Sequence, residues 1–551
     1  MKRLLQEIGW FWRQKIYVGM LCLTAACSYG FAVTHYSIGI DDTAVSLYLE
    51  EGLEVVMGRW TVFLVNKLFH LSDFTPFMSE LVGVLLLMLG VTLFAVLMRR
   101  IFGQGTGIWG YTLFACAFLS NPILSEVYIY YYHDGVDLGY VLTALALLSF
   151  MEGMERTGRG KLSAYLGSMV FVWIASGCYE SLIILYILGI LLIVFLRGAV
   201  GKDRLTFSHL AKNLGTGALL SAGCVILRSI TIPLMTVLFG LQDAVGILPQ
   251  RSLTEMFTLF RGKEGLLDFF MLVKRFWVVY HVNALVYLPV TVYETACICM
   301  GIYAVVMAVR KKNLWYPVLF AGMLITPFLL TVATAEITLY RACQYLPFFA
   351  AAGVLVIYRA FEQKKKSVPY LRYAVSFLGI VLLWNQAAMM NRNFYRDYQK
   401  YEYTRGVLSK VAYEVEKTYG TDLPVVFTGH DSVPYEFVSD YYVGYGSWQY
   451  RMIAGITDLV DEHLKEKYFQ PQGYCFIGEA QYPFIQWAFD AFDGTNREMI
   501  AFLKMHGNEF STVSDKEILE QAREIGDSMP GWPAEGSISL QDGYVLVHFD
   551  E

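Results

Sequence analysis

The chain has 551 residues, of which 56% are hydrophobic and only 17% are charged. A soluble protein carries about 25% charged residues, so this composition excludes a wholly soluble chain. The net charge of −5 says little about partners, and without a long basic stretch we expect no nucleic acid partner. Long apolar runs fill residues 1–390, whereas residues 391–551 have an ordinary soluble composition. We therefore expect a large membrane domain followed by one globular domain.

Apolar runs of membrane-spanning length follow one another along residues 1–390. The first run comes after a short basic N-terminus and lacks a cleavage site, which indicates an uncleaved signal anchor. A membrane helix needs about 20 apolar residues, and this rule predicts about eleven spans. The fold class is therefore a polytopic α-helical membrane protein. The predicted spans are residues 16–34, 78–98, 107–124, 135–151, 162–178, 181–197, 211–232, 289–309, 314–334, 341–358 and 370–388.

Basic residues in the short loops predict the orientation. They all fall on the side of the N-terminus, which the positive-inside rule makes cytoplasmic. The long loops and residues 391–551 are then extracytoplasmic. The basic loop residues are Arg99, Arg100, Arg156, Arg159, Lys161, Arg197, Lys202, Arg204, Arg310, Lys311, Lys312, Lys364, Lys365 and Lys366.

Two outer segments are too polar or too broken to span a bilayer. Residues 54–71 fit a helix that lies along the outer interface. Residues 233–288 contain Pro233 and Pro249 and are expected to be re-entrant or interfacial pieces.

The C-terminal part, residues 391–551, has the mixed pattern of an extracytoplasmic α/β domain. The sequence predicts helices at 402–419, 455–468, 495–506 and 515–526, and strands at 425–428, 474–477, 538–540 and 544–548. The last two strands form a hairpin around Asp542-Gly543. Three tryptophans, Trp448, Trp487 and Trp532, could stack on sugars, but we favour a place in the core.

An acidic pair, Asp41-Asp42, follows the first predicted span. In an arbitrary membrane protein such a pair is usually only a solvated loop feature. Here it lies at head-group depth and is flanked by apolar and aromatic residues such as Tyr36 and Tyr48. Other polar residues also fall at outer span ends, so we interpret the pair as part of a site.

The stretch HYSIGIDDTAVSLY, the later Gly-Arg-Trp triplet, and the motifs YYYHDG and CYES carry a resemblance. With the many spans and the outer C-terminal domain, they resemble the GT-C class of membrane glycosyltransferases. More narrowly, they are similar to the Gtr-type (type II) bacterial membrane glucosyltransferase family. The resemblance covers most of residues 1–390.

This resemblance implies an inverting transfer of a hexose, typically glucose, from a polyprenyl-phosphate carrier to a cell-surface glycan, in the bacterial plasma membrane. It maps the general base to Asp41. Asp42 then orients Asp41, or binds sugar hydroxyls or a divalent cation such as Mg²⁺ or Mn²⁺. One carboxylate base suffices because the phosphate is a good leaving group, unlike the two carboxylates of glycoside hydrolysis.

The leaving phosphate needs cations near the outer interface, and arginine binds phosphate oxygens bidentately. Arg59 could equally be an interfacial anchor, and Arg228 a side chain that extends from its span to the interface. Arg341 opens a span, and we favour a functional role for it. The candidates are Arg59, Arg228, Lys274, Arg275 and Arg341.

Sugar contacts are predicted for Tyr132, His133, Asp134 and Glu180. The alternatives are an aromatic belt with a polar turn for the first three, and an ordinary turn acid for Glu180.

Two other classes remain open. A transporter or flippase would place ionisable residues and broken helices at mid-membrane, with repeat symmetry. A scaffold or a polysaccharide polymerase could share the topology, but a scaffold has no need of an ionisable Asp41.

Overall fold

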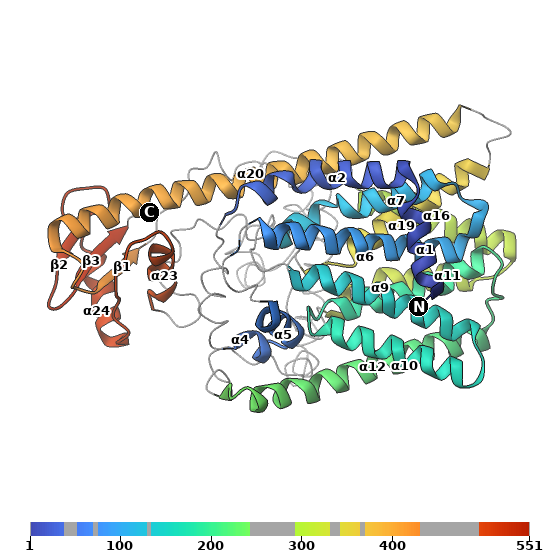
Figure 1. The fold of residues 1–551 in the computed structure, drawn as a ribbon, viewed down its shortest axis with the longest axis horizontal. Coiled ribbons are helices and arrows are strands. Elements are labelled where there is room, and N and C mark those ends of the chain that lie inside the picture. Colours follow the sequence, from blue (N-terminus) through green and yellow to red (C-terminus); the bar gives the residue numbers. More distant parts are fainter. Residues whose placement is uncertain are drawn as a thin grey trace, which may run out of the picture.

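The computed structural model describes residues 2–37, 52–69, 75, 77–128, 134–242, 292–330, 342–363, 370–429 and 495–549. Most of them form a bundle of long helices, and a small α/β module lies at one end of the molecule (Figure 1). Predicted features at 38–51, 243–291, 331–341 and 430–494 lie outside the described residues.

Each predicted span overlaps a helix in this part of the chain, because an uninterrupted apolar run satisfies its backbone polar groups internally only as a helix. The helices of the bundle are α1 (Lys2–Trp12), α2 (Lys15–Thr34), α6 (Met78–Phe102), α7 (Ile108–Leu119), α8 (Ser125–Tyr128), α9 (Asp134–Glu155), α10 (Gly158–Ser176), α11 (Leu182–Ala199), α12 (Phe207–Leu238), α16 (Val292–Lys311), α17 (Trp315–Ile325), α19 (Leu346–Gln363) and α20 (Leu371–Tyr419).

Seven helices within the described residues are long and apolar enough to cross a membrane, which identifies a multi-pass membrane protein. The other helices at predicted spans are α10, α16, α17 and α19, so eleven spans remain a prediction. The seven are Lys15–Thr34, Met78–Phe102, Ile108–Tyr128, Gly135–Glu155, Leu182–Ala199, Phe207–Leu238 and Tyr373–Tyr419.

The end of α12 differs from the sequence prediction. We expected a span to end at residue 232 and re-entrant or interfacial pieces to begin at Pro233, but α12 continues through Pro233 to Leu238. Proline removes one backbone donor from a helix. The donor that is missing at residue 233 would have bonded the Ser229 carbonyl, so the cost is one hydrogen bond within the last turns of the helix.

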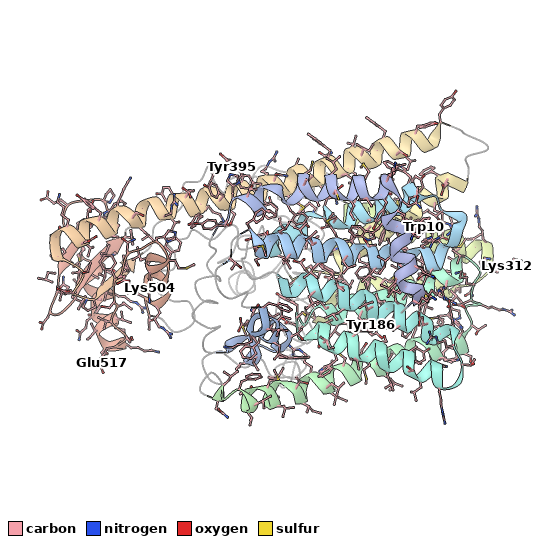
Figure 2. The ribbon with its side chains drawn as sticks, viewed as in Figure 1. Trp10, Tyr186, Lys312, Tyr395, Lys504 and Glu517 are labelled. Carbon is pink, nitrogen blue, oxygen red and sulfur yellow. The ribbon has the colours of Figure 1, made fainter. Side chains whose placement is uncertain are left out.

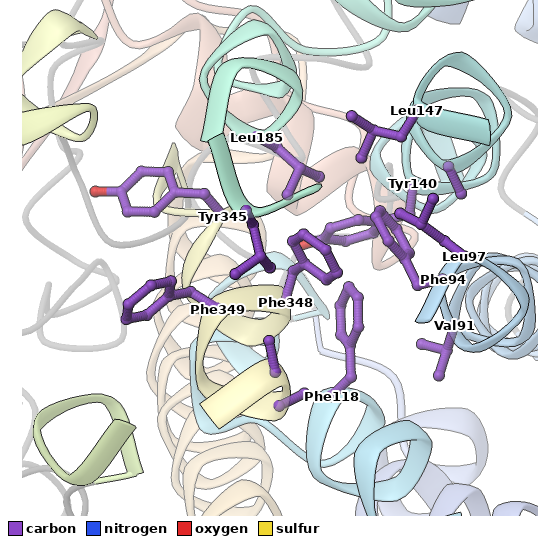
Figure 3. Packing of buried hydrophobic residues seen from close by; sticks show 14 of the residues in the cluster. Val91, Phe94, Leu97, Phe118, Tyr140, Leu147, Leu185, Tyr345, Phe348 and Phe349 are labelled. Atoms are coloured by element: carbon purple, nitrogen blue, oxygen red, sulfur yellow. The ribbon is translucent and has the colours of Figure 1, made fainter. Parts of the chain in front are cut away.

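Aromatic side chains fill the centre of the bundle (Figure 3). Phe94 of α6 packs against Phe348 of α19, with ring centroids 4.6 Å apart, and against Phe118 of α7 at 5.2 Å. The Tyr140 hydroxyl of α9 donates to the carbonyl of Gln344 at 3.0 Å, which satisfies the polar end of this buried ring. Large apolar side chains thus hold α6, α7, α9 and α19 together.

The basic loops gather at the end of the bundle that also holds α1, as the positions of Trp10 and Lys312 in Figure 2 show. Arg100 forms ion pairs with Glu7 at 2.6 Å and with Glu152 at 3.2 Å. Arg197 likewise contacts Glu155 at 2.5 Å. These pairs join helices far apart in sequence at what we call the basic-loop end.

Helix α20 is continuous for 49 residues and shows no break at residue 390, where we expected the domain boundary. It runs beside α2 along the bundle and then continues past it to the C-terminal module (Figure 1). The expected helix 402–419 is therefore the last part of α20. The module itself comprises residues 401–429 and 495–549, and Figure 2 places Lys504 and Glu517 in it.

The C-terminal module is built on a three-stranded sheet of order β1-β3-β2. Strands β1 (Val425–Gly429) and β3 (Val545–Phe549) are parallel, and β2 (Ile538–Leu540) is antiparallel to β3. Because side chains alternate across a strand, Phe427 and Val547 pack against α20 and α23 (Arg497–Met505). Val426 and Leu546 pack against α24 (Lys516–Gly526) on the other face.

The described part of the module agrees with the predicted α/β pattern, including the hairpin around Gly543. Trp532 is partly buried at the edge of the core of this module, and its indole N–H donates to Glu414 at 3.1 Å, so it meets the favoured core position only in part. Trp448 and Trp487 lie outside the described residues.

Candidate functional site

Two short helices, α4 (Leu53–Val56) and α5 (Trp60–Phe69), lie at the end of the bundle opposite the basic-loop end (Figure 1). We expected one interfacial helix over 54–71, but the chain turns at Gly58. The Arg59 amide donates to the Glu54 carbonyl at 2.6 Å, and the Gly58 amide donates to the Val55 carbonyl at 2.9 Å. With a φ of +84° at Gly58, this is a Schellman cap, which favours glycine at that position. The Gly-Arg-Trp triplet thus ends one helix and begins the next.

Arg228 of α12 reaches this turn from the side. Its Nη2 donates to the carbonyls of Met57 at 3.3 Å and Gly58 at 3.4 Å, and its Nε donates to the Ser176 carbonyl at 3.4 Å. Carbonyls at a helix end lack partners within the helix. Arg228 therefore ties the end of α4 to the end of α10.

Arg59 and Glu180 complete a group of charges at the turn. The Arg59 guanidinium carbon lies 4.6 Å above the centre of the Tyr179 ring, within the range of a cation–π contact. Tyr179 and Glu180 form the tight connection between α10 and α11. Both Glu180 and Arg59 lie close enough to Arg228 to act on its charge. Three predicted site residues, Arg59, Glu180 and Arg228, thus come together from three separate elements.

Close packing holds α5 on this group. The Trp60 ring lies 5.1 Å from the Trp173 ring, centroid to centroid. The Thr61 amide donates to the Gly177 carbonyl at 3.0 Å. A β-carbon at Gly177 would lie 2.4 Å from the Thr61 hydroxyl oxygen and 2.5 Å from Trp60. Glycine at 177 therefore allows the start of α5 to approach α10.

Sequence reasoning did not select Glu54, which lies buried one turn before Arg59. Burial raises the pKa of Glu54 to about 7, and the nearby Arg59 and Lys67 charges only partly oppose this rise. Among the described residues its Oε2 has no hydrogen-bond partner. The signal in the sequence was the position of an acid within an otherwise apolar turn of helix.

The remaining predicted site residues cannot be placed in the same way. Asp41, Asp42, Tyr132, His133 and Arg341 lie outside the described residues, as do Lys274 and Arg275; Asp134 is the first residue of α9. The two ends of the segment that carries the acidic pair are described. Ser37 contacts Asp397 of α20, and a β-carbon at Gly52 would lie 2.4 Å from Leu241 after α12.

Within the described ranges, no group of three or more histidine, cysteine, aspartate or glutamate side chains could hold a metal ion. The acidic pair is not part of that search, so a divalent cation there stays a prediction.

The multi-pass helical bundle, with a cluster of arginines and acids where several of its helices end, defines an integral membrane protein with a polar group at one end of the bundle. A family described as Glucosyl transferase GtrII matches residues 30–358, more than half of the chain. The chain therefore belongs to this family and is a glycosyltransferase that uses a sugar donor and a glycan acceptor. The family resemblance predicted from the motifs is confirmed. Neither a curated protein nor a solved structure matches the chain.

Proposed function

We propose that this protein transfers a hexose, for which the family description favours glucose, from a polyprenyl-phosphate carrier to a cell-surface glycan on the outer face of the bacterial plasma membrane. The observation that carries the proposal is the convergence of Arg59, Arg228 and Glu180 at the bundle end opposite the basic loops. The segment 38–51, which holds the acidic pair, is followed by Gly52, whose carbonyl accepts from the Val55 amide at 3.1 Å at the start of α4, the helix that ends at the Gly58-Arg59 turn.

The orientation follows from the loop charges. Short loops rich in lysine and arginine remain in the cytoplasm, so the basic-loop end and the N-terminus face the cytosol. The Gly58-Arg59 turn and the C-terminal module then face outward, where a surface glycan is available as acceptor. The proposed GT-C class rests on this arrangement together with the family match.

The proposed chemistry is a single displacement. The acceptor hydroxyl oxygen attacks the anomeric carbon, and the bond from that carbon to the phosphate oxygen breaks with its electron pair on the phosphate. The Asp41 carboxylate takes the hydroxyl proton as general base. Attack opposite the leaving group inverts the anomeric centre. Asp42 orients Asp41 or binds sugar hydroxyls.

Within this scheme Arg59 is the best-supported ligand of the donor phosphate. Its stacking on Tyr179 orients the planar guanidinium, and in the described part of the chain its buried Nε has no hydrogen-bond partner. Arg228, in contrast, donates to three backbone carbonyls. We assign it the role of holding the turn, with Arg341 as a further candidate for the phosphate.

The decisive experiment compares glycans of cells that carry the gene, lack it, or carry Asp41→Asn. We expect the variant to insert normally and to lose transfer by at least about 100-fold, the range of general-base catalysis. Asp422→Asn, at an exposed acid of the C-terminal module, is the matched control. Normal glycan decoration with Asp41→Asn would overturn the assignment of the base.

A further inference from the structure

Helix α20 carries a buried pair of opposite charges where it leaves the bundle. Lys400 Nζ lies 3.9 Å from Asp397 Oδ1, and their side chains are 1% and 5% exposed. Glu126 of α8 lies close enough to Lys400 to add its negative charge. One turn earlier, Asn393 donates to the Ser125 hydroxyl at 2.8 Å. This face of α20 is therefore polar and enclosed by the bundle.

A buried ion pair is weak evidence for stability, because removing two charges from water costs about as much as their attraction returns. The presence of a buried ion pair is better explained where the pair fixes the position of another part of the chain. Here the second carboxylate oxygen of Asp397 accepts a hydrogen bond from the Ser37 hydroxyl. Lys400 holds the carboxylate, and the carboxylate holds Ser37.

The three residues after α2 all contact the same stretch of α20. The His35 ring lies 5.4 Å from the Tyr398 ring, and the Tyr36 ring lies 5.9 Å from the Tyr401 ring, centroid to centroid. With Ser37 bound to Asp397, the chain is attached residue by residue just before segment 38–51. Asp41 comes four positions after Ser37, at most about 14 Å of extended chain.

We propose that Asp397, held by Lys400, is a positioning residue that sets where the segment with the acidic pair begins. This inference rests on the proposed role of Asp41. It assigns a part in the reaction to α20, which lies beyond residues 30–358 matched by the family. The C-terminal module is joined to the same helix, so its attachment also bears on the site.

The test uses full-length protein and initial rates of transfer from polyprenyl-phosphate glucose. Ser37→Ala removes the donor of the hydrogen bond. The double variant Asp397→Leu with Lys400→Met removes the acceptor and its lysine together, so that neither of these two charges is left buried without the other. We expect each to lower kcat by about 10- to 100-fold, as for a misplaced catalytic group. The donor KM should change less than twofold, since Arg59 is on another element.

Combining Ser37→Ala with the double variant should lower kcat no further than either alone, because both remove one interaction. Ser37→Thr keeps the hydroxyl and should retain most of the rate. The matched control is Glu402→Leu with Arg405→Met, a pair on the same helix with the same spacing but more exposed side chains. It should leave kcat unchanged.

Full kcat in Ser37→Ala, losses that multiply in the combined variant, or loss of folded protein without loss of kcat would each overturn the inference. Asp41→Asn is assayed in parallel. If it is inactive while Ser37→Ala is fully active, only the positioning role fails. If Asp41→Asn is active, the proposed function fails as well.

Discussion

The guanidinium of Arg228 lies where a side chain at residue 58 would begin: a β-carbon there would lie 2.1 Å from Arg228 Nη2. The same guanidinium nitrogen donates to the Gly58 carbonyl at 3.4 Å. The glycine between α4 and α5 and an arginine 170 residues later therefore form one structural unit. The unit fixes the direction in which Arg59 leaves the turn.

Gly58→Ala tests this unit. It adds the cost of a positive φ, about 1–2 kcal/mol for an alanine, and displaces Arg228. Gly201→Ala is the matched control, since Gly201 has a φ of +79° but nothing within 4 Å of an added β-carbon. We expect Gly201→Ala to show only the backbone cost in thermal unfolding, with full transfer. Gly58→Ala should lose more stability and most of the transfer, and equal effects would argue against the contact with Arg228.

Arg59 and Arg228 should differ in their kinetic effects. Arg59→Ala should raise the donor KM about 10- to 100-fold, because a hydrogen bond to a charged group contributes about 1.5–3 kcal/mol. Arg228→Lys should damage stability almost as much as Arg228→Ala, since an ammonium group cannot reach all three carbonyls. Arg204→Ala, in an exposed basic loop, controls for charge. A donor KM that responds to Arg228 and not to Arg59 would reverse the two roles.

Glu54 predicts a pH-dependent stability. Its pKa of about 7 exceeds the ordinary value of 4.5 because the side chain is buried. Between pH 4.5 and about pH 7, Glu54 is therefore protonated in the folded protein and ionised in the unfolded chain. The contribution of this bound proton to the free energy of unfolding is complete below pH 4.5. It is lost as pH rises through about 7, by up to about 3 kcal/mol.

Glu54→Gln should therefore flatten the dependence of the unfolding temperature on pH and stabilise the protein most above neutral pH. Glu520→Gln, at an exposed acid, should leave the profile unchanged. Parallel profiles for the wild type and Glu54→Gln would show that Glu54 does not titrate in this range.

His506 predicts the opposite trend for the C-terminal module. Its Nδ1 lies 2.7 Å from the Phe502 carbonyl, so Nδ1 carries the proton and Nε2 accepts from the Tyr401 hydroxyl at 2.8 Å. Burial lowers the pKa of His506 below its ordinary 6.5. The stabilisation that the neutral His506 side chain provides is present above pH 6.5. It is lost as pH falls through the lowered pKa of His506.

Limited proteolysis of residues 495–549 across this range measures the effect. His506→Gln should remove the added sensitivity at low pH. Tyr401→Phe should weaken protection at every pH while keeping the titration. If His506→Gln still loses protection at the same pH as the wild type, another group is responsible.

The helices were predictable because an apolar run of about 20 residues has one stable arrangement in lipid. The continuity of α20 was not, since the change of composition near residue 390 reports the surroundings of the chain and not its backbone. The contacts of Arg228 could not be predicted from the sequence either, because its carbonyl partners are set by packing between elements that are distant in the chain. The buried pair of Asp397 and Lys400 lies where composition indicated a soluble surface.

The length of α20 has a geometric consequence. At 1.5 Å per residue its 49 residues extend about 74 Å. A continuous helix, and not a flexible linker, therefore sets the distance of the C-terminal module from the bilayer. Each inserted residue rotates the far end by about 100°, so a single addition would turn a different face of the module toward the helix bundle. Seven added residues would raise it by about 10 Å with a rotation of only about 20°. The distance of the C-terminal module from the membrane can therefore change between relatives only in steps of about seven residues, if the module is to keep the same face toward the bundle.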